Sequence, residues 1–159
     1  MTLTITVVRH AQSAGKQSGQ QDFDRVLTEG GQRWVATLKK KLPDTVPPID
    51  ILIASAATRV KQTVQPLIPA LGLSDTKCRF ENELYEATSG DWIRTLQPLI
   101  TTHHHILLAG HNPGLSHLVS RWSGQIIDLI PGQVAGLEFS DPYDIMSVGM
   151  ARLIYNVHE

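Results

Sequence analysis

The sequence is poor in cysteine, since Cys78 is the only one among 159 residues. One thiol cannot form a disulfide within the chain, and a chain without disulfides is typical of a reducing compartment. We therefore expect a cytoplasmic protein. Cys78 lies in the strand-like run KCRFE. Because no tight turn there would present a reactive thiol, a catalytic use of this residue is disfavoured.

Long apolar stretches are also missing, and no segment approaches the ~20 residues that a membrane-spanning helix needs. The first residues, MTLTITVVRH, have only a short apolar run with no basic residue ahead of it, which is not the pattern of a signal peptide. The formal net charge is -1. This balance argues against binding to nucleic acid or to an anionic membrane through bulk charge. We expect neither partner, and a bound anion must be held by a few placed cations.

Two signatures of other phosphate chemistries are absent. There is no Asp/Glu/His cluster of the kind that two-metal phosphatases use, and no glycine-rich phosphate loop of the nucleotide-binding kind. Neighbouring residues of an extended chain point to opposite faces, so the consecutive His103, His104 and His105 would chelate poorly as a trio. We expect them at a solvated strand entrance. Neither a metal nor another cofactor is predicted.

What is present suits one compact domain over residues 1–159. Apolar residues make up 42% of the chain and charged residues 18%, which is ordinary for a protein that buries a core. Apolar and β-branched runs predict buried strands at residues 3–8, 49–54, 77–81 and 105–109. Helical spacing and capping residues predict helices at residues 28–42, 57–71 and 91–101, and one that opens at Asn112–Pro113 with Asn112 as its N-cap.

Prolines set the expected ends of two helices. The first helix should end at Pro43, Pro47 and Pro48, and the second should break or kink at Pro66 and Pro69. Two later segments, 133–139 and 147–157, predict a hairpin at the edge of the sheet, joined by the turn SDPYD. The alternation of strands and helices predicts an α/β three-layer sandwich. Its central sheet is mainly parallel, with helices on both faces and an antiparallel edge hairpin.

In such a sheet the ligand binds beyond the carboxyl ends of the strands, and four cationic or titratable residues are expected there. Arg9 and His10 end the first strand, Arg59 follows the second, and His111 follows the fourth, just before a helix N-terminus. Each residue alone is weak evidence, because a polar residue after a strand is common. Arginine forks match phosphate oxygens, and a neutral imidazole can attack phosphorus. The four together therefore predict a site for a phosphoryl group.

Four sequence segments, in the order VVRHAQSAG, LTEGGQRWV, SAATRVKQTV and AGHNPGL, resemble the motifs of the histidine phosphatase superfamily and span residues 7 to 115. The chain is most similar to the short SixA-type phosphohistidine phosphatase branch of this superfamily. This likeness rests on the small size of the chain, on Ala11 and on the segments LYEA and GHNPGL. The resemblance implies that His10 is the nucleophile, with a covalent phosphohistidine intermediate. It also implies that Arg9 and Arg59 clamp the phosphoryl oxygens, and that His111 stabilises the transferring group. One ring nitrogen of His10 must then be unprotonated, so we expect a backbone carbonyl to hold its other N–H.

Other positions are less determined by the sequence. Family members usually carry a carboxyl acid that protonates the leaving group. Glu86 fits that place and Glu83 is the alternative, although a solvated loop glutamate would also fit. Ser13 and Asn112 are candidate substrate-binding residues, but a loop serine and a helix cap need no such role. His117 is expected to be structural. Three tryptophans on apolar helix faces are expected in the core: Trp34, Trp92 and Trp122.

Three functions fit these residues. The first is a phosphatase for phosphohistidine on a protein, such as the phosphotransfer domain of a two-component relay. The second is a phosphatase or mutase for small metabolites on the same site, and the third is a non-catalytic phosphate-binding module. The intact four-residue set disfavours the third. The 24 residues between Glu86 and His111 hold one predicted helix and one strand. They leave little for a lid, which favours a bulky protein substrate over a metabolite. The sequence leaves the oligomeric state open.

Overall fold

The computed structural model describes residues 1–159 and contains one six-stranded sheet in the order β3-β2-β4-β1-β5-β6. The four strands on one side run parallel: β1 (Leu3–Arg9), β2 (Ile51–Ser55), β3 (Cys78–Glu81) and β4 (His105–Gly110). The other two form antiparallel pairs: β5 (Val134–Phe139) runs antiparallel to β1, and β6 (Ala151–Val157) runs antiparallel to β5. The expected mainly parallel sheet with an antiparallel edge pair is confirmed.

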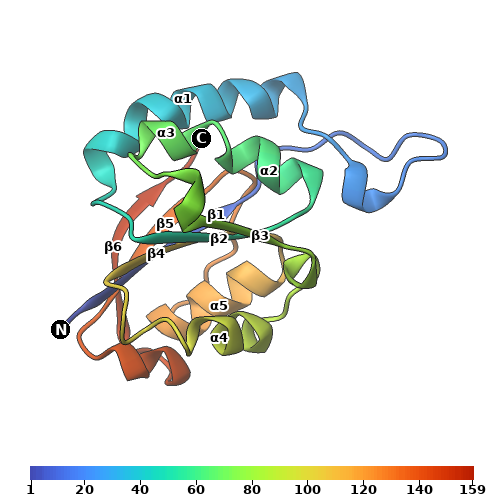
Figure 1. Ribbon diagram of the computed structural model, residues 1–159. Coiled ribbons are helices and arrows are strands. Elements are labelled where there is room, and N and C mark those ends of the chain that lie inside the picture. The colour runs from blue at the N-terminus through green and yellow to red at the C-terminus, as the bar shows by residue number, and fades with distance from the viewer.

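Helices cover both faces of the sheet, as Figure 1 shows. One face carries α1 (Glu29–Thr45), α2 (Thr58–Val64) and α3 (Leu67–Ala70). The other carries α4 (Ser89–Leu96) and α5 (Gly114–Ser123). The sheet therefore lies between two apolar cores, as a three-layer sandwich requires. None of these helices combines the length and apolar character needed to cross a membrane.

The two cores follow from the alternation of side chains along the strands. In β1, Ile5 and Val7 face the core under α4 and α5, and Val8 faces the core under α1 to α3. Both faces are apolar because both are covered, as is usual for parallel strands. All three tryptophans are buried, as expected: Trp34, Trp92 and Trp122.

Several helix boundaries differ from those expected. The helix α1 continues through Pro43 to Thr45, because a proline near a helix end removes only one backbone hydrogen bond. The predicted helix 57–71 is two helices separated at Pro66, as expected for a residue with no N–H to donate. The helix α4 starts at Ser89, before the predicted 91, because Thr88 and Asp91 form a capping box. It ends at Leu96, before the predicted 101.

His105 is buried rather than solvated, contrary to the expectation for this histidine run. Its Nδ1 donates to the Pro48 carbonyl at 2.9 Å, so its Nε2 must accept, and the Thr6 hydroxyl lies 2.7 Å away. The Tyr155 hydroxyl in turn donates to Thr6. This chain of hydrogen bonds explains how a polar ring fits in the core, because every one of its polar atoms has a partner.

We predict that Thr6→Val lowers the free energy of unfolding by about 1–3 kcal/mol. The change removes a donor from the buried His105 Nε2 and an acceptor from Tyr155 at almost constant volume. Urea denaturation measures the loss. Thr4→Val is the matched control on the same strand, since its side chain makes no hydrogen bond, and it should change stability by less than ~0.5 kcal/mol. Equal effects of the two substitutions would contradict this account.

Candidate active site

Pairing between β1 and β4 brings the two histidine motifs together. Arg9 lies opposite Gly110 in the sheet register, and the His10 backbone N–H donates to the Gly110 carbonyl at 3.1 Å. The rings of His10 and His111 therefore lie side by side, with centroids 5.4 Å apart. On the other side of His10, the Ala11 N–H donates to Thr63 of α2 at 2.9 Å. This bond joins the end of β1 to the helix that carries Arg59.

The ring of His10 is held in one orientation. Its Nδ1 lies 2.8 Å from the Ala11 carbonyl. A carbonyl can only accept, so Nδ1 carries the proton and Nε2 keeps its lone pair. This is the arrangement expected for the ring. Burial, together with the positive charges of Arg59, Arg9 and Arg25, lowers the pKa of His10 to about 4, although the hydrogen bond to the Ala11 carbonyl opposes the shift. His10 is therefore neutral, and its Nε2 can act as a nucleophile, at neutral pH.

His111 is also kept neutral. Its Nε2 and the Ser55 hydroxyl are 2.8 Å apart, which fixes the ring against the end of β2. Burial, together with the neighbouring His10 and Arg59, lowers its pKa to about 3, although the charge of Asp22 opposes the shift. A neutral ring does not add a buried positive charge to those of the arginines.

The predicted arginines approach the same place from different elements. Arg9 at the end of β1 donates through Nη1 to the Leu129 carbonyl at 2.7 Å. Arg59 on α2 is 7% exposed, so its guanidinium is largely shielded from water. Only two buried side-chain nitrogen or oxygen atoms in the chain have no hydrogen-bond partner, Arg9 Nε and His111 Nδ1. Such atoms are rare in folded proteins, and both of these belong to the cluster around His10.

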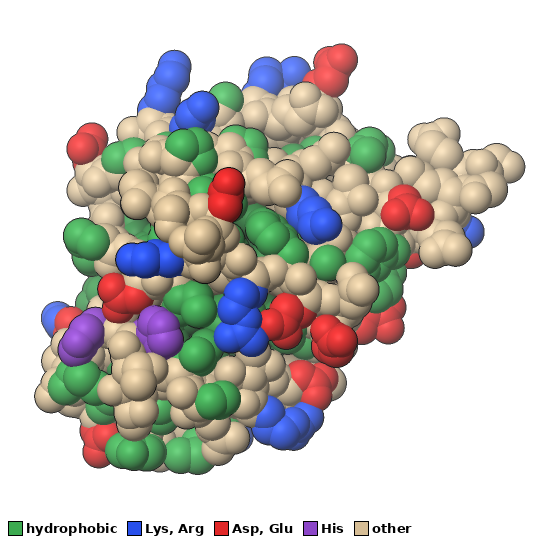
Figure 2. Space-filling model, in the orientation of Figure 1, with side chains coloured by type: hydrophobic (Ala, Val, Ile, Leu, Met, Phe, Trp, Pro, Cys, Tyr) green, Lys and Arg blue, Asp and Glu red, His purple; other side chains and the backbone are tan.

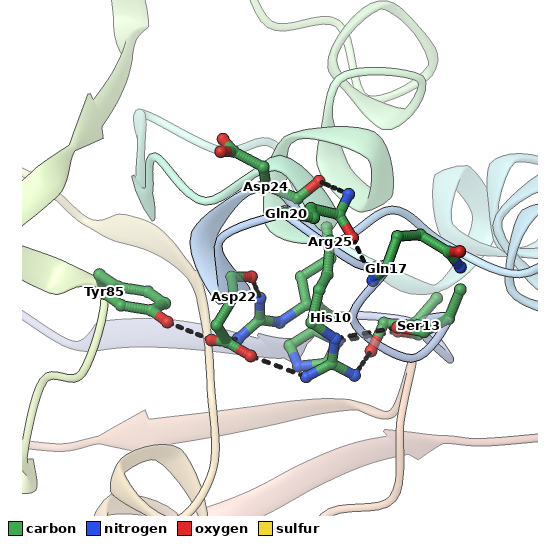
Figure 3. A network of polar contacts seen from close by, with 11 residues as sticks. His10, Ser13, Gln17, Gln20, Asp22, Asp24, Arg25 and Tyr85 are labelled. Atoms are coloured by element: carbon green, nitrogen blue, oxygen red, sulfur yellow. Dashed lines mark hydrogen bonds and ion pairs between the residues drawn. The ribbon is translucent and has the colours of Figure 1, made fainter.

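Sequence reasoning missed a third arginine, Arg25, in the loop between β1 and α1. Its Nε donates to the Ala14 carbonyl, its Nη1 to Asp22 and its Nη2 to the Ser13 hydroxyl, each at 2.9 Å. Figure 3 shows the guanidinium beside His10. Asp22 and Tyr85 were missed as well: the Tyr85 hydroxyl donates to the Asp22 carboxylate. The loop has a polar composition without periodicity, so no sequence pattern distinguishes these residues from solvated ones.

The structure gives the weaker candidates unequal support. Ser13 reaches the cluster only through Arg25, and its contact with substrate stays a prediction. Asn112 is not the N-cap of α5, because Pro113 holds that place. Its side chain instead accepts from Ser116 N–H at 3.2 Å and donates to the Leu129 carbonyl at 2.9 Å. Asn112 therefore links the start of α5 to the segment that binds Arg9.

A cavity of about 430 Å³ adjoins the cluster. Its lining includes Arg59, Tyr85 and His111 of the cluster and also Glu86 and His117. Glu83 lies in a different depression, beside Arg94. The geometry therefore favours Glu86 over Glu83 as a group that can reach a leaving group. His117 is exposed and faces this cavity, contrary to the structural role expected for it.

Positive charge at the site comes from single arginines and not from a basic surface. Figure 2 shows Lys and Arg side chains interspersed with Asp and Glu over the displayed face. No group of three His, Cys, Asp or Glu side chains is placed to hold a metal ion. The arrangement as it stands can bind a small oxyanion between arginines and present an imidazole nitrogen to it.

Comparisons of the sequence with known proteins identify its family. A family model described as the histidine phosphatase superfamily (branch 1) matches residues 5–125. The chain is 32% identical over 111 residues to the uncharacterized protein Rv1276c of Mycobacterium tuberculosis, covering 70% of this chain and 66% of that protein. It is 34% identical over 95 residues to the 2,3-bisphosphoglycerate-dependent phosphoglycerate mutase of Mesorhizobium japonicum, covering 57% of this chain and 45% of the mutase. The chain thus matches less than two thirds of the length of either relative.

A likeness of fold extends over the whole chain. The structure of the protein histidine phosphatase SixA in complex with tungstate has a TM-score of 0.82. The superposition covers 98% of this chain and 96% of that one, at 19% sequence identity. The cluster of arginines and histidines described above therefore lies in a fold that SixA shares.

We predict that the two site histidines make stability fall as the pH drops below 6.5. Their pKa values are depressed in the folded state, to about 4 and about 3, so between those values and 6.5 the unfolded chain binds more protons. The free energy of unfolding should be highest above pH 6.5 and fall as pH decreases toward 4. Urea unfolding at pH 7.5, 5.5 and 4.5 measures the slope. Compared with the wild type, the slope should be shallower in His10→Ala and unchanged in a variant of the exposed His158. Equal slopes in the wild type and both variants would contradict the prediction.

Proposed function

The chain belongs to the histidine phosphatase superfamily (branch 1), and from its site we propose that this phosphatase hydrolyses phosphohistidine on a protein substrate. The observation that carries the proposal is the neutral His10 ring, whose free Nε2 lies among three arginines. This is a nucleophile with cations around it that match the charge of a phosphoryl group. No metal or other cofactor enters the proposed chemistry.

The reaction proceeds in two displacements. The lone pair of His10 Nε2 attacks phosphorus, an Nε2–P bond forms, and the bond from phosphorus to the leaving group breaks. Water then attacks the same phosphorus, the Nε2–P bond breaks, and inorganic phosphate leaves. Positive charge that develops on the His10 ring during the first step is shared with its Nδ1–H, which the Ala11 carbonyl stabilises.

The arginines act on the transferring group. Negative charge is spread over three phosphoryl oxygens in the transition state, and fixed donors aimed at those oxygens lower the barrier. Arg9 and Arg59 supply such donors as expected from the sequence, and Arg25 is added to them. His111 has a buried Nδ1 without a protein partner. This atom gives the ring a polar contact for a phosphoryl oxygen.

The cavity supports a phosphohistidine leaving group. An imidazole that is already protonated leaves as a neutral ring, whereas an alcohol must take a proton from an acid as it leaves. Glu86 is the one carboxyl group among the cavity-lining residues, and it is exposed to solvent. Between Glu86 and His111 lie only α4, β4 and short connections, so this segment supplies no lid for the cavity. An open cavity suits a side chain presented by a folded protein, such as a phosphotransfer domain of a two-component relay.

A small phosphorylated metabolite is the second candidate substrate. The cavity has room for such a molecule beyond the phosphoryl group and has mainly polar lining residues. The likeness to a phosphoglycerate mutase also favours it. Both candidate substrates would use His10 and the arginines, and they differ in the leaving group, which is an imidazole in one case and an alcohol in the other.

We predict that His10→Ala reduces kcat below about a thousandth of the wild-type value and leaves the fold intact. The substitution removes the atom to which phosphorus is transferred. Rapid quenching of the wild type with a labelled phosphohistidine protein should trap acid-labile, base-stable phosphate on the enzyme, and His10→Ala should trap none. Near wild-type turnover in the variant would exclude the covalent mechanism.

We predict that Glu86→Gln separates the two candidate substrates. Loss of a general acid should lower kcat/KM for a phosphomonoester about 10²-fold or more, and should change kcat/KM for a phosphohistidine protein much less. Glu83→Gln is the matched control, because Glu83 lies outside the cavity. Equal losses on both substrates, or a wild-type preference for a sugar phosphate, would favour the metabolite phosphatase.

A further inference from the structure

The loop between β1 and α1 places a carboxylate among the arginines. Asp22 lies at the start of a short 3-10 turn, residues Asp22–Asp24, and its side chain is about half exposed. It accepts from Arg25 Nη1 at 2.9 Å and from Arg59 Nη2 at 3.2 Å. The Tyr85 hydroxyl donates to the same carboxylate. A negative group beside an anion site needs an explanation, because by charge alone it would repel the phosphoryl group.

Asp22 binds Arg59 in a way that leaves part of the guanidinium unpaired. The Asp22 backbone carbonyl accepts from Nη1 at 2.7 Å, and its carboxylate accepts from Nη2. Both contacts lie on the edge formed by the two terminal nitrogens. Arg59 Nε makes no hydrogen bond, so the other edge of the fork is available to an oxyanion. Asp22 thus fixes the plane of the guanidinium without using all of its donors.

Asp22 also reduces the repulsion between two cations. Arg25 and Arg59 both place a terminal nitrogen within hydrogen-bonding distance of this one carboxylate. Without it, the two guanidinium groups would repel each other and could turn toward solvent. The same contacts, Tyr85 first, hold the pKa of Asp22 well below its usual range, so the carboxylate stays ionised at any pH at which the enzyme would work.

The loop that carries Asp22 is braced against the domain. At its base, Ala14 N–H donates to the Val26 carbonyl at 2.8 Å, and Thr28 N–H donates to the Gln12 carbonyl at 3.0 Å. Farther out, Gln20 accepts from Gln17 N–H at 2.9 Å and donates to the Asp24 carbonyl at 3.0 Å. Figure 3 shows the contacts of Gln20 with Gln17 and Asp24, together with Asp22, Arg25 and Tyr85. The carboxylate therefore has a defined position relative to the arginines.

From these contacts we infer that Asp22 is a positioning residue for the phosphoryl clamp. It holds Arg59 and Arg25 in the orientation that binds the oxyanion, and Tyr85 holds Asp22 from the cavity side, where its ring lies 5.8 Å from the Arg59 guanidinium. The inference rests on the proposed phosphoryl transfer at this site, and not on which molecule carries the phosphoryl group. It makes a carboxylate necessary for binding an anion.

The test measures oxyanion binding and catalysis in Asp22→Asn and Asp22→Glu. Vanadate is the probe for binding, by calorimetry, and p-nitrophenyl phosphate is the probe for turnover. Asp22→Asn keeps the shape but removes the charge, and should weaken vanadate binding and lower kcat/KM by about 10-fold or more. Asp22→Glu keeps the charge at a shifted position and should recover part of both. Asp24→Asn is the matched control, because Asp24 is exposed on the same turn and its side chain makes no hydrogen bond. The vanadate affinity and kcat/KM of Asp24→Asn should stay within about twofold of the wild-type values.

A double-mutant cycle with Arg59→Lys distinguishes positioning from a merely structural role. Lysine has no planar guanidinium for Asp22 to orient. In the Arg59→Lys background, Asp22→Asn should therefore lower vanadate affinity and kcat/KM by less than about threefold. Thermal unfolding of each variant checks that the fold is retained, and Asp22→Glu supplies the second variant if Asp22→Asn is unfolded. Vanadate binding that is unchanged or tighter in Asp22→Asn, or full additivity with Arg59→Lys, would overturn the inference. Binding needs no turnover, so a wild type that binds vanadate but hydrolyses nothing would refute the proposed function alone. A wild type that binds no vanadate would refute both.

Discussion

The register between β1 and β4 is the constraint on which the site depends. Parallel pairing of Arg9 with Gly110 sets His10 beside His111, and the apolar faces of both strands fix that register because each face is covered by helices. A slip by one residue would turn every side chain of β1 to the opposite core. The position of two catalytic candidates is thus determined by residues that take no part in the chemistry, such as Ile5, Val7 and Val8.

A second constraint is that buried charge must be kept low. The cluster contains three arginines and two histidines, yet both histidines are held neutral and Asp22 balances one of the arginines. The positive charge that remains comes from groups that cannot lose their protons. A site arranged in this way attracts an anion while its nucleophile keeps a free lone pair.

Much of this could be read from the sequence, and the reasons for success and failure are physical. The strands were predictable because buried parallel strands are apolar and β-branched over their whole length, and the ends of β1, β2 and β4 then placed Arg9, His10, Arg59 and His111 at one edge. The contacts of Arg25, Asp22 and Tyr85 join residues up to 63 positions apart across an irregular loop, and no local pattern encodes them. His105 and His117 were misjudged for a related reason. Whether a lone histidine is buried depends on partners such as Thr6, and no local pattern names them.

The pairing of β1 with β4 also bears on how the domain acquires its function. His10 and His111 are separated by about a hundred residues, and those residues contain three of the strands and four of the helices. Closing so long a segment is entropically costly and is compensated only when the sheet forms. The two rings therefore meet only when this strand pair has formed, and no partly folded chain that lacks the pair can contain the site. Catalytic activity in this protein is consequently a measure of the fraction of molecules that have completed folding.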